Sequence, residues 1–446
     1  MQSPRSMLFS VTRDVGLGLG LGLQLALRHG KPLAGSFDIR VTCNYFTMCK
    51  RSGIRKENEY KKKVKDEMNE KTNCLQRRFI GGSSNSIRSA YDTSPAKQQS
   101  ILKKNMTQHP KVICLGNPLL DIQIDVQPSY LEKYNLKSND AILVEQSSNK
   151  SILNIFDEIV EMEGVKFVAG GAAQNTARGV AYVLGPGQVG YFGSVGEDKF
   201  SARLLKENEA AGVASFYQVQ KDISTGKCAA LITGHDRSLV TDLAAANHFT
   251  PDHLDKHWDL VEAASLFYIG GFHLTVSPEA IVKLGKHAQE KGKPFILNLS
   301  APFIPAFFKA ALEQVLPYTT YVIGNESEAA SYAESFGLDC DKEDLEAIAK
   351  HIVGDSKTRT VIITHGLKPT VVVSAEGSKT FDVVPLDSSK IKDTNGAGDA
   401  FAGGFVAALA EGKSLEFAIA QGQWLASLSI QEVGPSYPTE RKQFNL

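Results

Sequence analysis

Short apolar runs alternate with longer amphipathic segments from about residue 109 onward. The apolar runs have the length of buried strands and lie at 111–115, 189–192, 266–269, 295–299, 321–323, 361–364 and 371–373. Between several of them, apolar residues recur at helical spacing, at 172–184, 199–211, 278–291, 306–315, 326–336 and 342–353. This alternation predicts an α/β fold, with a doubly wound, mainly parallel sheet flanked by helices.

Two stretches, near 122–143 and 216–241, interrupt this alternation. They contain short strand-like runs without helical patterns between them. We therefore expect a small β-rich lid built from excursions out of the main sheet. A lid suits a site from which water must be excluded during a reaction.

The first 108 residues differ in composition from the rest. Residues 1–110 contain 20 Lys and Arg against 8 Asp and Glu, whereas residues 111–446 contain 29 against 41. The formal net charge of zero therefore hides a basic arm joined to an acidic domain. Because 81–108 is polar and has little to bury, we predict a basic, disordered arm at 1–108 and a folded domain at 109–446.

Two segments of the arm have more than one interpretation. The Leu-Gly repeat at 15–27 fits a mitochondrial presequence better than a secretory signal, because Asp14 abuts it and no cleavage site follows. The charged run at 50–67 is typical of a solvated linker, with nucleic-acid binding or nuclear import as the alternative.

The six cysteines show no Cys-x-x-Cys spacing. This predicts a reduced intracellular protein in the cytoplasm, with the nucleus as a second location and the mitochondrion as a minor alternative. No apolar run approaches the roughly 20 residues that span a bilayer. We expect a monomer that binds small molecules and no specific nucleic acid.

A glycine-rich turn at 393–399 (DTNGAGD) precedes the apolar segment 401–409. Gly396 and Gly398 lack a Cβ atom, so their N–H groups can approach an anion, and the start of a helix adds further donors. Asp399 is unsuited to bind phosphate but suits a general base that takes a proton from a hydroxyl group. The alternative is an ordinary glycine turn with Asp399 as a helix cap.

A second loop, at 169–177, enters the predicted helix at 172–184. The N–H groups of its glycines and the side chain of Asn175 can satisfy sugar hydroxyls, although glycines at a helix entry can also serve close packing alone. Asp121 follows the first strand and is suited to bind a vicinal diol. Open α/β sheets bind ligands at the carboxyl ends of their strands, where these residues are expected.

Asn325 and Glu328 form a third pattern, at the end of one predicted strand and in the first turn of the next helix. Such an acid commonly completes a capping box. It can instead orient the water shell of Mg²⁺, which keeps several waters and needs few carboxylates. From the residues alone, both interpretations stay open.

The stretch at 393–401 (DTNGAGDAF) resembles the C-terminal signature of the ribokinase-like family of sugar and nucleoside kinases. Further similarities lie at 116–122 (GNPLLDI), 236–239 (DRSL), 243–247 (LAAAN) and 298–303 (NLSAPF). The resemblance covers the chain from about residue 111 and none of the basic arm.

The resemblance implies transfer of the γ-phosphoryl group of ATP to the 5′-hydroxyl of adenosine, with Mg²⁺, to give AMP for purine salvage. It implies these roles: Asp399 as base; Gly396, Ala397 and Gly398 as anion hole; Arg237 on the ATP phosphates; Asp121, Gly170, Gly171 and Asn175 on the ribose; Leu143 and Phe303 beside the adenine; Asn325, Thr364, Gly366 and Asn395 along ATP; and Glu328 on Mg²⁺ through water.

Two positions depart from the family pattern. Ala172 and Ala173 follow Gly171 where some members carry hydroxyl residues, so a hydrogen bond to the substrate is expected to be missing. His273 stands where an apolar residue is common. We predict a hydrogen-bonded surface histidine, with an effect on the pocket as the alternative.

Other functions stay open at this point. A kinase of the same family that acts on inosine, guanosine or a free sugar would have the same catalytic residues. A nucleoside-binding protein without turnover is disfavoured by the intact Asp399. A dinucleotide-binding oxidoreductase is disfavoured because no Gly-x-Gly-x-x-Gly follows Leu115.

Overall fold

The computed structural model describes residues 8–11, 23–26, 40–42, 109–138, 141–144, 149–234 and 236–445. The chain divides into two units, Met1–Tyr91 and Asp92–Leu446. In the first unit, β1 (Leu8–Val11), β2 (Leu23–Ala26) and β3 (Arg40–Thr42) form an antiparallel sheet. The rest of the predicted arm lies outside the described residues, so its disorder stays a prediction.

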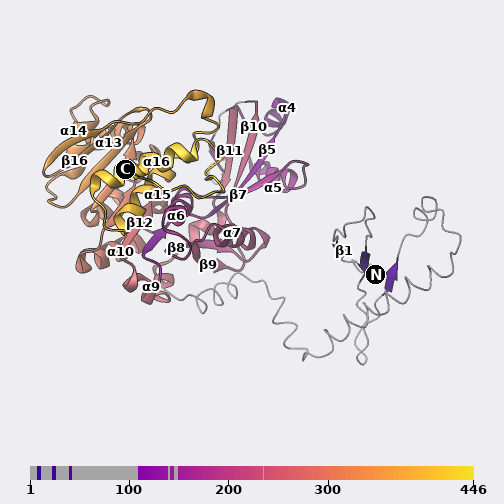
Figure 1. The fold of residues 1–446 in the computed structure, drawn as a ribbon. Coiled ribbons are helices and arrows are strands. Elements are labelled where there is room, and N and C mark those ends of the chain that lie inside the picture. Colours follow the sequence, from indigo (N-terminus) through magenta and orange to yellow (C-terminus); the bar gives the residue numbers. More distant parts are fainter. Residues whose placement is uncertain are drawn as a thin grey trace. The chain divides into compact units, whose positions relative to one another are not determined.

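A main sheet forms the centre of the second unit (Figure 1). In the described part of the chain its nine strands run in the order β17 (Gly377–Phe381), β16 (Lys368–Ser374), β15 (Thr360–His365), β14 (Tyr321–Asn325), β13 (Phe295–Asn298), β12 (Leu266–Gly270), β4 (Val112–Leu115), β8 (Val189–Gly196) and β9 (Ala214–Gln220). Strands from β15 to β9 are parallel, while β16 and β17 add an antiparallel edge. The predicted doubly wound, mainly parallel sheet is therefore confirmed.

Alternate residues of the central strand face two separate cores. In β4, Ile113 and Leu115 pack in one core, and Val112 and Cys114 in the other. The first core is covered by α10 (Pro278–Lys291), α12 (Lys309–Val315), α13 (Glu326–Phe336) and α14 (Leu345–Val353). The second is covered by α6 (Ala172–Leu184), α7 (Lys199–Ala210), α15 (Ala397–Ala410) and α16 (Leu415–Ser429). Burial on both faces explains why these strands read as continuous apolar runs.

Most predicted helices are confirmed, and α6, α10 and α13 have the predicted bounds. The helix predicted at 306–315 is wrong, because the structure has α11 (Phe303–Phe307) and α12, which are separated at Phe308. Phe308 has φ −116° and ψ 30°, which is outside the helical region. Among the described residues, no helix has the length and apolar character needed to cross a membrane.

A second sheet lies beside the main one, with α4 (Pro128–Lys133) and α5 (Asn154–Ile159) (Figure 1). Among the residues that the structure describes, its strands run in the order β6 (Ala141–Leu143), β11 (Asp236–Asp242), β10 (Lys227–Thr233), β5 (Leu119–Asp125) and β7 (Lys166–Gly170). Ile122, Ala229, Leu231 and Val240 give it a core of its own.

The predicted segments at 122–143 and 216–241 therefore need correction. The first contains α4, although no helix was expected there, and residues 216–220 belong to β9 of the main sheet. In addition, β7 joins the second sheet from outside both segments. Periodicity identifies a strand but not the sheet that it joins, because pairing depends on partners distant in sequence.

Candidate active site

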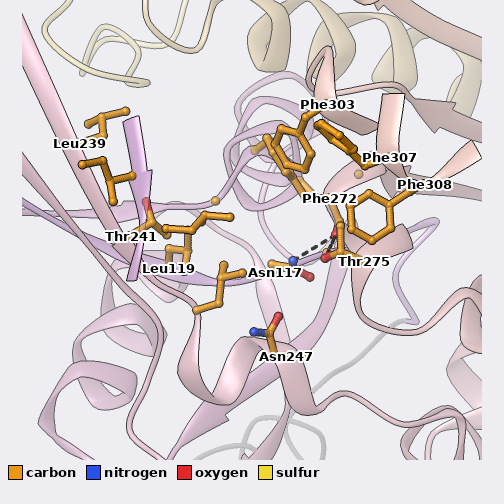
Figure 2. A pocket seen from close by; sticks show the side chains of 18 residues that line it. Asn117, Leu119, Leu239, Thr241, Asn247, Phe272, Thr275, Phe303, Phe307 and Phe308 are labelled. Carbon is orange, nitrogen blue, oxygen red and sulfur yellow. Dashed lines mark hydrogen bonds between the residues drawn. The ribbon is translucent and has the colours of Figure 1, made fainter. Parts of the chain in front are cut away.

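A cavity of about 720 Å³ opens between the two sheets and the start of α6 (Figure 2). It is lined by Gly116, Asn117, Leu119, Ile142, Leu143, Gly171, Ala172, Ala173, Leu239, Thr241, Leu243, Asn247, Gly270, Phe272, Thr275, Phe303, Phe307 and Phe308. Figure 2 shows the aromatic rings of Phe303, Phe307 and Phe308 together on one side, away from Leu239 and Thr241. The volume lies within the range of small-molecule sites.

Three residues predicted to contact the substrate line this cavity: Leu143, Gly171 and Phe303. The small residue Ala173 has a packing reason, since a Cβ atom on Gly116 would lie 2.4 Å from the Cβ of Ala173. Four further residues line the cavity that were not predicted as site residues: Asn117, Thr241, Phe272 and Phe308. Their place there depends on how the two sheets pack together.

Asp399 lies half-buried in the first turn of α15. Its Oδ2 accepts a hydrogen bond of 2.8 Å from the side-chain amide of Asn175, in the first turn of α6. Burial raises the pKa of Asp399 to about 7, and the Asp121 carboxylate adds to this, while Asn175 and Arg178 oppose it. A carboxylate with a pKa near neutrality is suited to accept a proton in a reaction near pH 7.

The glycine turn before α15 has an open side and a packed side. Gly396 has φ +78°, and a Cβ atom there would lie 2.6 Å from the Cβ of Pro435. At Gly398 an added Cβ would meet nothing within 4 Å. No side chain caps α15, so the first-turn N–H groups of Gly398 and Asp399 face outward without helical acceptors. This is the geometry of an anion site.

Asp393, which was not predicted as a site residue, stabilises this turn through two hydrogen bonds. Its Oδ1 accepts from the N–H of Asn395 at 2.9 Å, and its Oδ2 accepts from the N–H of Gly434 at 3.0 Å. Asn395 itself is exposed. The turn is therefore tied to the chain segment that follows α16.

Asp121 was predicted to lie just after the first strand. The structure places it within β5, which begins at Leu119. It pairs in register with Val168 of β7, and a Cβ atom on Gly170 would lie 2.3 Å from its Oδ1. Gly170 therefore makes room for the carboxylate. Asp121 is also close enough to Asp399 to raise its pKa, so the structure brings the two predicted sites together.

Asn325 and Glu328 form the capping box that the sequence offered as the alternative to magnesium. The Oδ1 of Asn325 accepts from the N–H of Glu328 at 2.9 Å. The carboxylate of Glu328 accepts from the backbone N–H and the side-chain amide of Asn325, both at 3.0 Å. Glu328 is buried, which raises its pKa to about 7. Each carboxylate oxygen thus accepts a hydrogen bond from Asn325, which shows Glu328 as part of a helix cap, while its contact with Mg²⁺ stays a prediction.

Among the described residues, no group of three or more His, Cys, Asp or Glu side chains could hold a metal ion by itself. Two other residues predicted along ATP lie near Asn325: Thr364 pairs with it in β15, and Gly366 follows with φ +55°. Arg237 lies in β11, opposite Ile232, and its side chain is outside what the structure describes.

Comparison with known proteins identifies the group to which this site belongs. The family described as pfkB family carbohydrate kinase matches residues 129–442. Adenosine kinase of Saccharomyces cerevisiae is 69% identical over 335 residues, which cover 75% of this chain and 98% of that protein. Adenosine kinase of Schizophyllum commune is 47% identical over 343 residues, with 75% and 98% covered. The chain belongs to the adenosine kinases of the pfkB family.

Solved structures of adenosine kinases share the fold of the second unit. The enzyme of Anopheles gambiae in complex with P1,P4-di(adenosine-5) tetraphosphate has a TM-score of 0.67 and 37% identity, and the match covers 74% of this chain and 99% of that one. The enzyme of Schistosoma mansoni in complex with 2-fluoroadenosine has a TM-score of 0.67 and 34% identity, with 74% and 98% covered. The predicted ribokinase-like fold is thus confirmed.

His273 was predicted to lie on the surface, and this prediction is wrong. It is fully buried, in a turn at 271–275, and does not lie on the surface. Its Nδ1 lies 2.7 Å from the Oδ1 of Asn117, whose Nδ2 donates to the carbonyl of Phe272 at 3.3 Å. Burial lowers the pKa of His273 to about 3, so the ring is neutral. His273 therefore supports a wall of the cavity through Asn117.

Arg178 is the other functional residue that the sequence did not reveal. It lies in the second turn of α6 and is 9% exposed. Its Nη2 donates to the Oδ1 of Asn175 at 2.9 Å, on the side of the amide that faces away from Asp399. The one sequence feature that could have indicated its role is a single arginine in an otherwise apolar helix, because charged side chains are rarely buried unless they are paired.

Proposed function

We propose that the protein transfers the γ-phosphoryl group of ATP to the 5′-hydroxyl of adenosine, giving AMP and ADP. The observation that carries this proposal is the contact of Asn175 with Asp399, where the starts of α6 and α15 meet. It places a carboxylate with a raised pKa beside an open anion site and near a cavity of nucleoside size. The relatives named above are adenosine kinases, which supports adenosine as acceptor.

In the proposed reaction, Asp399 takes the proton of the 5′-hydroxyl as the oxygen attacks the γ-phosphorus. The bond from the γ-phosphorus to the bridging oxygen breaks, and ADP leaves with the electron pair. The N–H groups of Gly396 and Gly398 are proposed to stabilise the negative charge on the phosphoryl oxygens. The role predicted for Ala397 needs correction, because its N–H donates to the carbonyl of Thr394 at 3.2 Å. Mg²⁺ bound to the ATP phosphates would neutralise charge during the transfer. Glu328 is proposed to orient its water shell, and Arg237 to contact the phosphates.

The nucleoside is proposed to lie in the cavity with its ribose toward Asp121, Gly171 and Asn175. The aromatic side, with Phe272 and Phe303 at 5.8 Å between ring centroids, offers flat apolar contact to a purine. A free sugar would leave this side uncovered, so the cavity favours a nucleoside acceptor. Inosine and guanosine are the second candidates, because they share the ribose and the ring.

The test is ADP formation by the full-length protein with ATP and Mg²⁺, when adenosine, inosine, guanosine and ribose are offered in parallel. Asp399→Ala should lower the rate about 10² to 10⁴-fold, which is typical for loss of a general base. Asp341→Ala removes an exposed aspartate from a loop before α14 and should leave the rate unchanged. Turnover with another acceptor in place of adenosine would refute adenosine as the substrate. Adenosine binding without turnover would refute the proposal that the protein is an enzyme.

Cytoplasmic location and a monomeric state are also part of our proposal. The location rests on cysteine usage: Cys114 and Cys228 are buried cysteines, and Cys114 is a free thiol, which suits a reducing compartment. Fluorescence microscopy of the tagged protein and size-exclusion chromatography with light scattering would test the two points separately.

A further inference from the structure

Arg178 is a buried cation whose hydrogen bonds all go to neutral oxygens. Its Nη2 donates to the Oδ1 of Asn175 at 2.9 Å and to the carbonyl of Pro435 at 3.0 Å, and its Nη1 donates to the carbonyl of Ala169. With 9% exposure, it keeps its charge in a place where desolvation is costly. The packing of α6 alone does not explain why a residue with this desolvation cost stands here.

The bond from Arg178 decides which end of the Asn175 amide faces Asp399. Guanidinium N–H groups can only donate, so the amide oxygen must point to Arg178. The amide nitrogen then points to Asp399 and donates to its Oδ2 at 2.8 Å. If the amide were reversed, its oxygen would face the carboxylate and repel it. Arg178 therefore holds Asn175 as a donor to Asp399.

Arg178 also binds the segment that supports the anion site. The carbonyl of Pro435 accepts from Arg178, and the ring of Pro435 packs where a side chain at Gly396 would stand. On the other side, the carbonyl of Ala169 in β7 accepts from Arg178, and Ala169 pairs with Leu120, the neighbour of Asp121 in β5. One guanidinium thus joins the second sheet, the start of α6 and the support of the glycine turn.

Charged and titratable groups reach Asp399 from several elements. Asp121 of β5 and Glu328 of α13 are acids, and Tyr268 of β12 and Tyr437 after α16 are phenols. Among these groups and Arg178, the arginine is the one cation. Its removal would leave Asp399 with acidic and phenolic neighbours that oppose its ionised form and with the Asn175 amide, which favours it.

We propose that Arg178 is a positioning residue for the phosphoryl transfer, which orients Asn175 toward Asp399 and ties Pro435 under the anion site. The proposal rests on the proposed function, because it concerns the base of that reaction. Arg178 itself does not touch the cavity, so its effect should appear in the rate and its pH dependence more than in the KM for adenosine.

A matched control exists elsewhere in the chain. Arg359 is also 9% exposed and donates to neutral oxygens, namely the carbonyls of Leu316 and Ile352 and the hydroxyl of Thr319. It directly precedes β15, at the amino end of the parallel strands, whereas the site lies at their carboxyl ends. Arg359→Met should therefore reproduce the loss of a buried arginine without the effect on Asp399.

The experiment compares Arg178→Met, Arg178→Lys and Arg359→Met with the wild type, in thermal unfolding and in kcat and kcat/KM from pH 5 to 9. Both methionine variants should unfold at lower temperature. Only Arg178→Met should lower kcat, about 10- to 100-fold, and move the acidic limb of kcat/KM upward by about one pH unit or more. Arg178→Lys keeps the charge, so its limb should stay near that of the wild type while kcat recovers in part.

A pH profile and a kcat of Arg178→Met that match those of Arg359→Met would overturn the proposal. If Arg178→Met does not fold, Arg178→Lys decides: wild-type kcat and wild-type pH limb together would show that no fixed guanidinium geometry is needed. Wild-type protein without adenosine turnover would instead refute the proposed function, so the two failures are distinguishable.

Discussion

Asn175 and Asp399 lie 224 positions apart in the chain and are joined by a hydrogen bond of 2.8 Å. The contact depends on the close approach of α6 and α15, which glycines permit. A Cβ atom on Gly403 of α15 would lie 2.9 Å from the Cα of Gly179 of α6. The small residues around Gly403 therefore serve catalysis at a distance, because they let the starts of the two helices meet.

The raised pKa of Asp399 predicts that its replacement stabilises the folded protein, although the same replacement lowers the reaction rate. In the unfolded chain this carboxyl ionises near pH 4, about the usual value, whereas in the folded protein its pKa is about 7. The folded state binds the proton more tightly, so Asp399 lowers stability as pH rises from about 4 to 7. Asp399→Asn should therefore unfold at a higher temperature than the wild type at pH 8.

Thermal unfolding at pH 4, 6 and 8 measures this effect. The advantage of Asp399→Asn should shrink toward pH 4, where the native carboxyl is protonated too. Asp341→Asn, at an exposed aspartate, serves as control and should show no such trend. An Asp399→Asn protein that is less stable than the wild type at pH 8 would contradict the assigned pKa direction.

Gly396 and Gly398 should respond differently to alanine. Gly396→Ala places a methyl group against Pro435 at a residue with φ +78°, so it should cost about 1 to 3 kcal/mol of stability and most of the activity. Gly398→Ala meets nothing within 4 Å and should leave stability unchanged. Its methyl group would enter the proposed phosphate space, so the KM for ATP should rise. Equal unfolding temperatures of the two variants would contradict this difference.

Glu328→Gln tests whether the capping box also serves the metal. The Asn325 side chain would still cap α13, because it accepts from the N–H of residue 328. If Glu328 orients water around Mg²⁺, the concentration of Mg²⁺ for half-maximal rate should rise about 10- to 100-fold. Glu334→Gln, on the same helix and bound to Lys342 at 2.8 Å, is the control. A reduced unfolding temperature with unchanged Mg²⁺ dependence would leave Glu328 as a cap alone.

His273→Phe replaces the buried imidazole with an apolar ring, the kind of residue that the family resemblance predicts at this position. It removes the donor to Asn117, so an amide oxygen in the cavity wall loses its partner, which typically costs about 1 to 3 kcal/mol. The KM for adenosine should rise more than kcat falls. The measurement is steady-state kinetics with adenosine and ATP varied separately, beside thermal unfolding.

The pH dependence of the same variant checks the state of the ring. Burial lowers the pKa of His273 to about 3, below the usual value of about 6.5, so its contribution to stability is present above pH 6.5 and is lost as pH falls toward 3. The difference in unfolding temperature between wild type and His273→Phe should therefore be largest above pH 6.5. A difference that does not change with pH would show that His273 is not the neutral, buried group described above.

The sequence predicted those parts of the molecule that depend on local pattern. Apolar periodicity located the strands of the main sheet and helices such as α6 and α13, and the turn before Asp399 was visible from its glycines. The capping box of Asn325 and Glu328, which lie three residues apart, is the alternative that the local pattern offers beside the magnesium interpretation, which the family resemblance favours. These features need no knowledge of which distant segments meet.

What the sequence could not predict depends on contacts between distant segments. His273 reads as a polar residue, but its partner Asn117 lies 156 positions away and allows it to be buried. Arg178 reads as an ordinary helix residue until Pro435 comes beside it, 257 positions later. The split of strands 216–220 and 227–233 between two sheets has the same origin, because strand pairing is set by tertiary packing.

The role of Pro435 has a consequence for protein synthesis. A nascent chain that has just been extended past Asp399 contains the base and the glycine turn, yet it lacks the segment that binds Arg178 and packs against Gly396. The residues that complete the site leave the ribosome after the residues that perform the reaction. Enzyme activity should therefore appear late in translation, and messages interrupted after α15 should yield inactive chains despite encoding the whole signature.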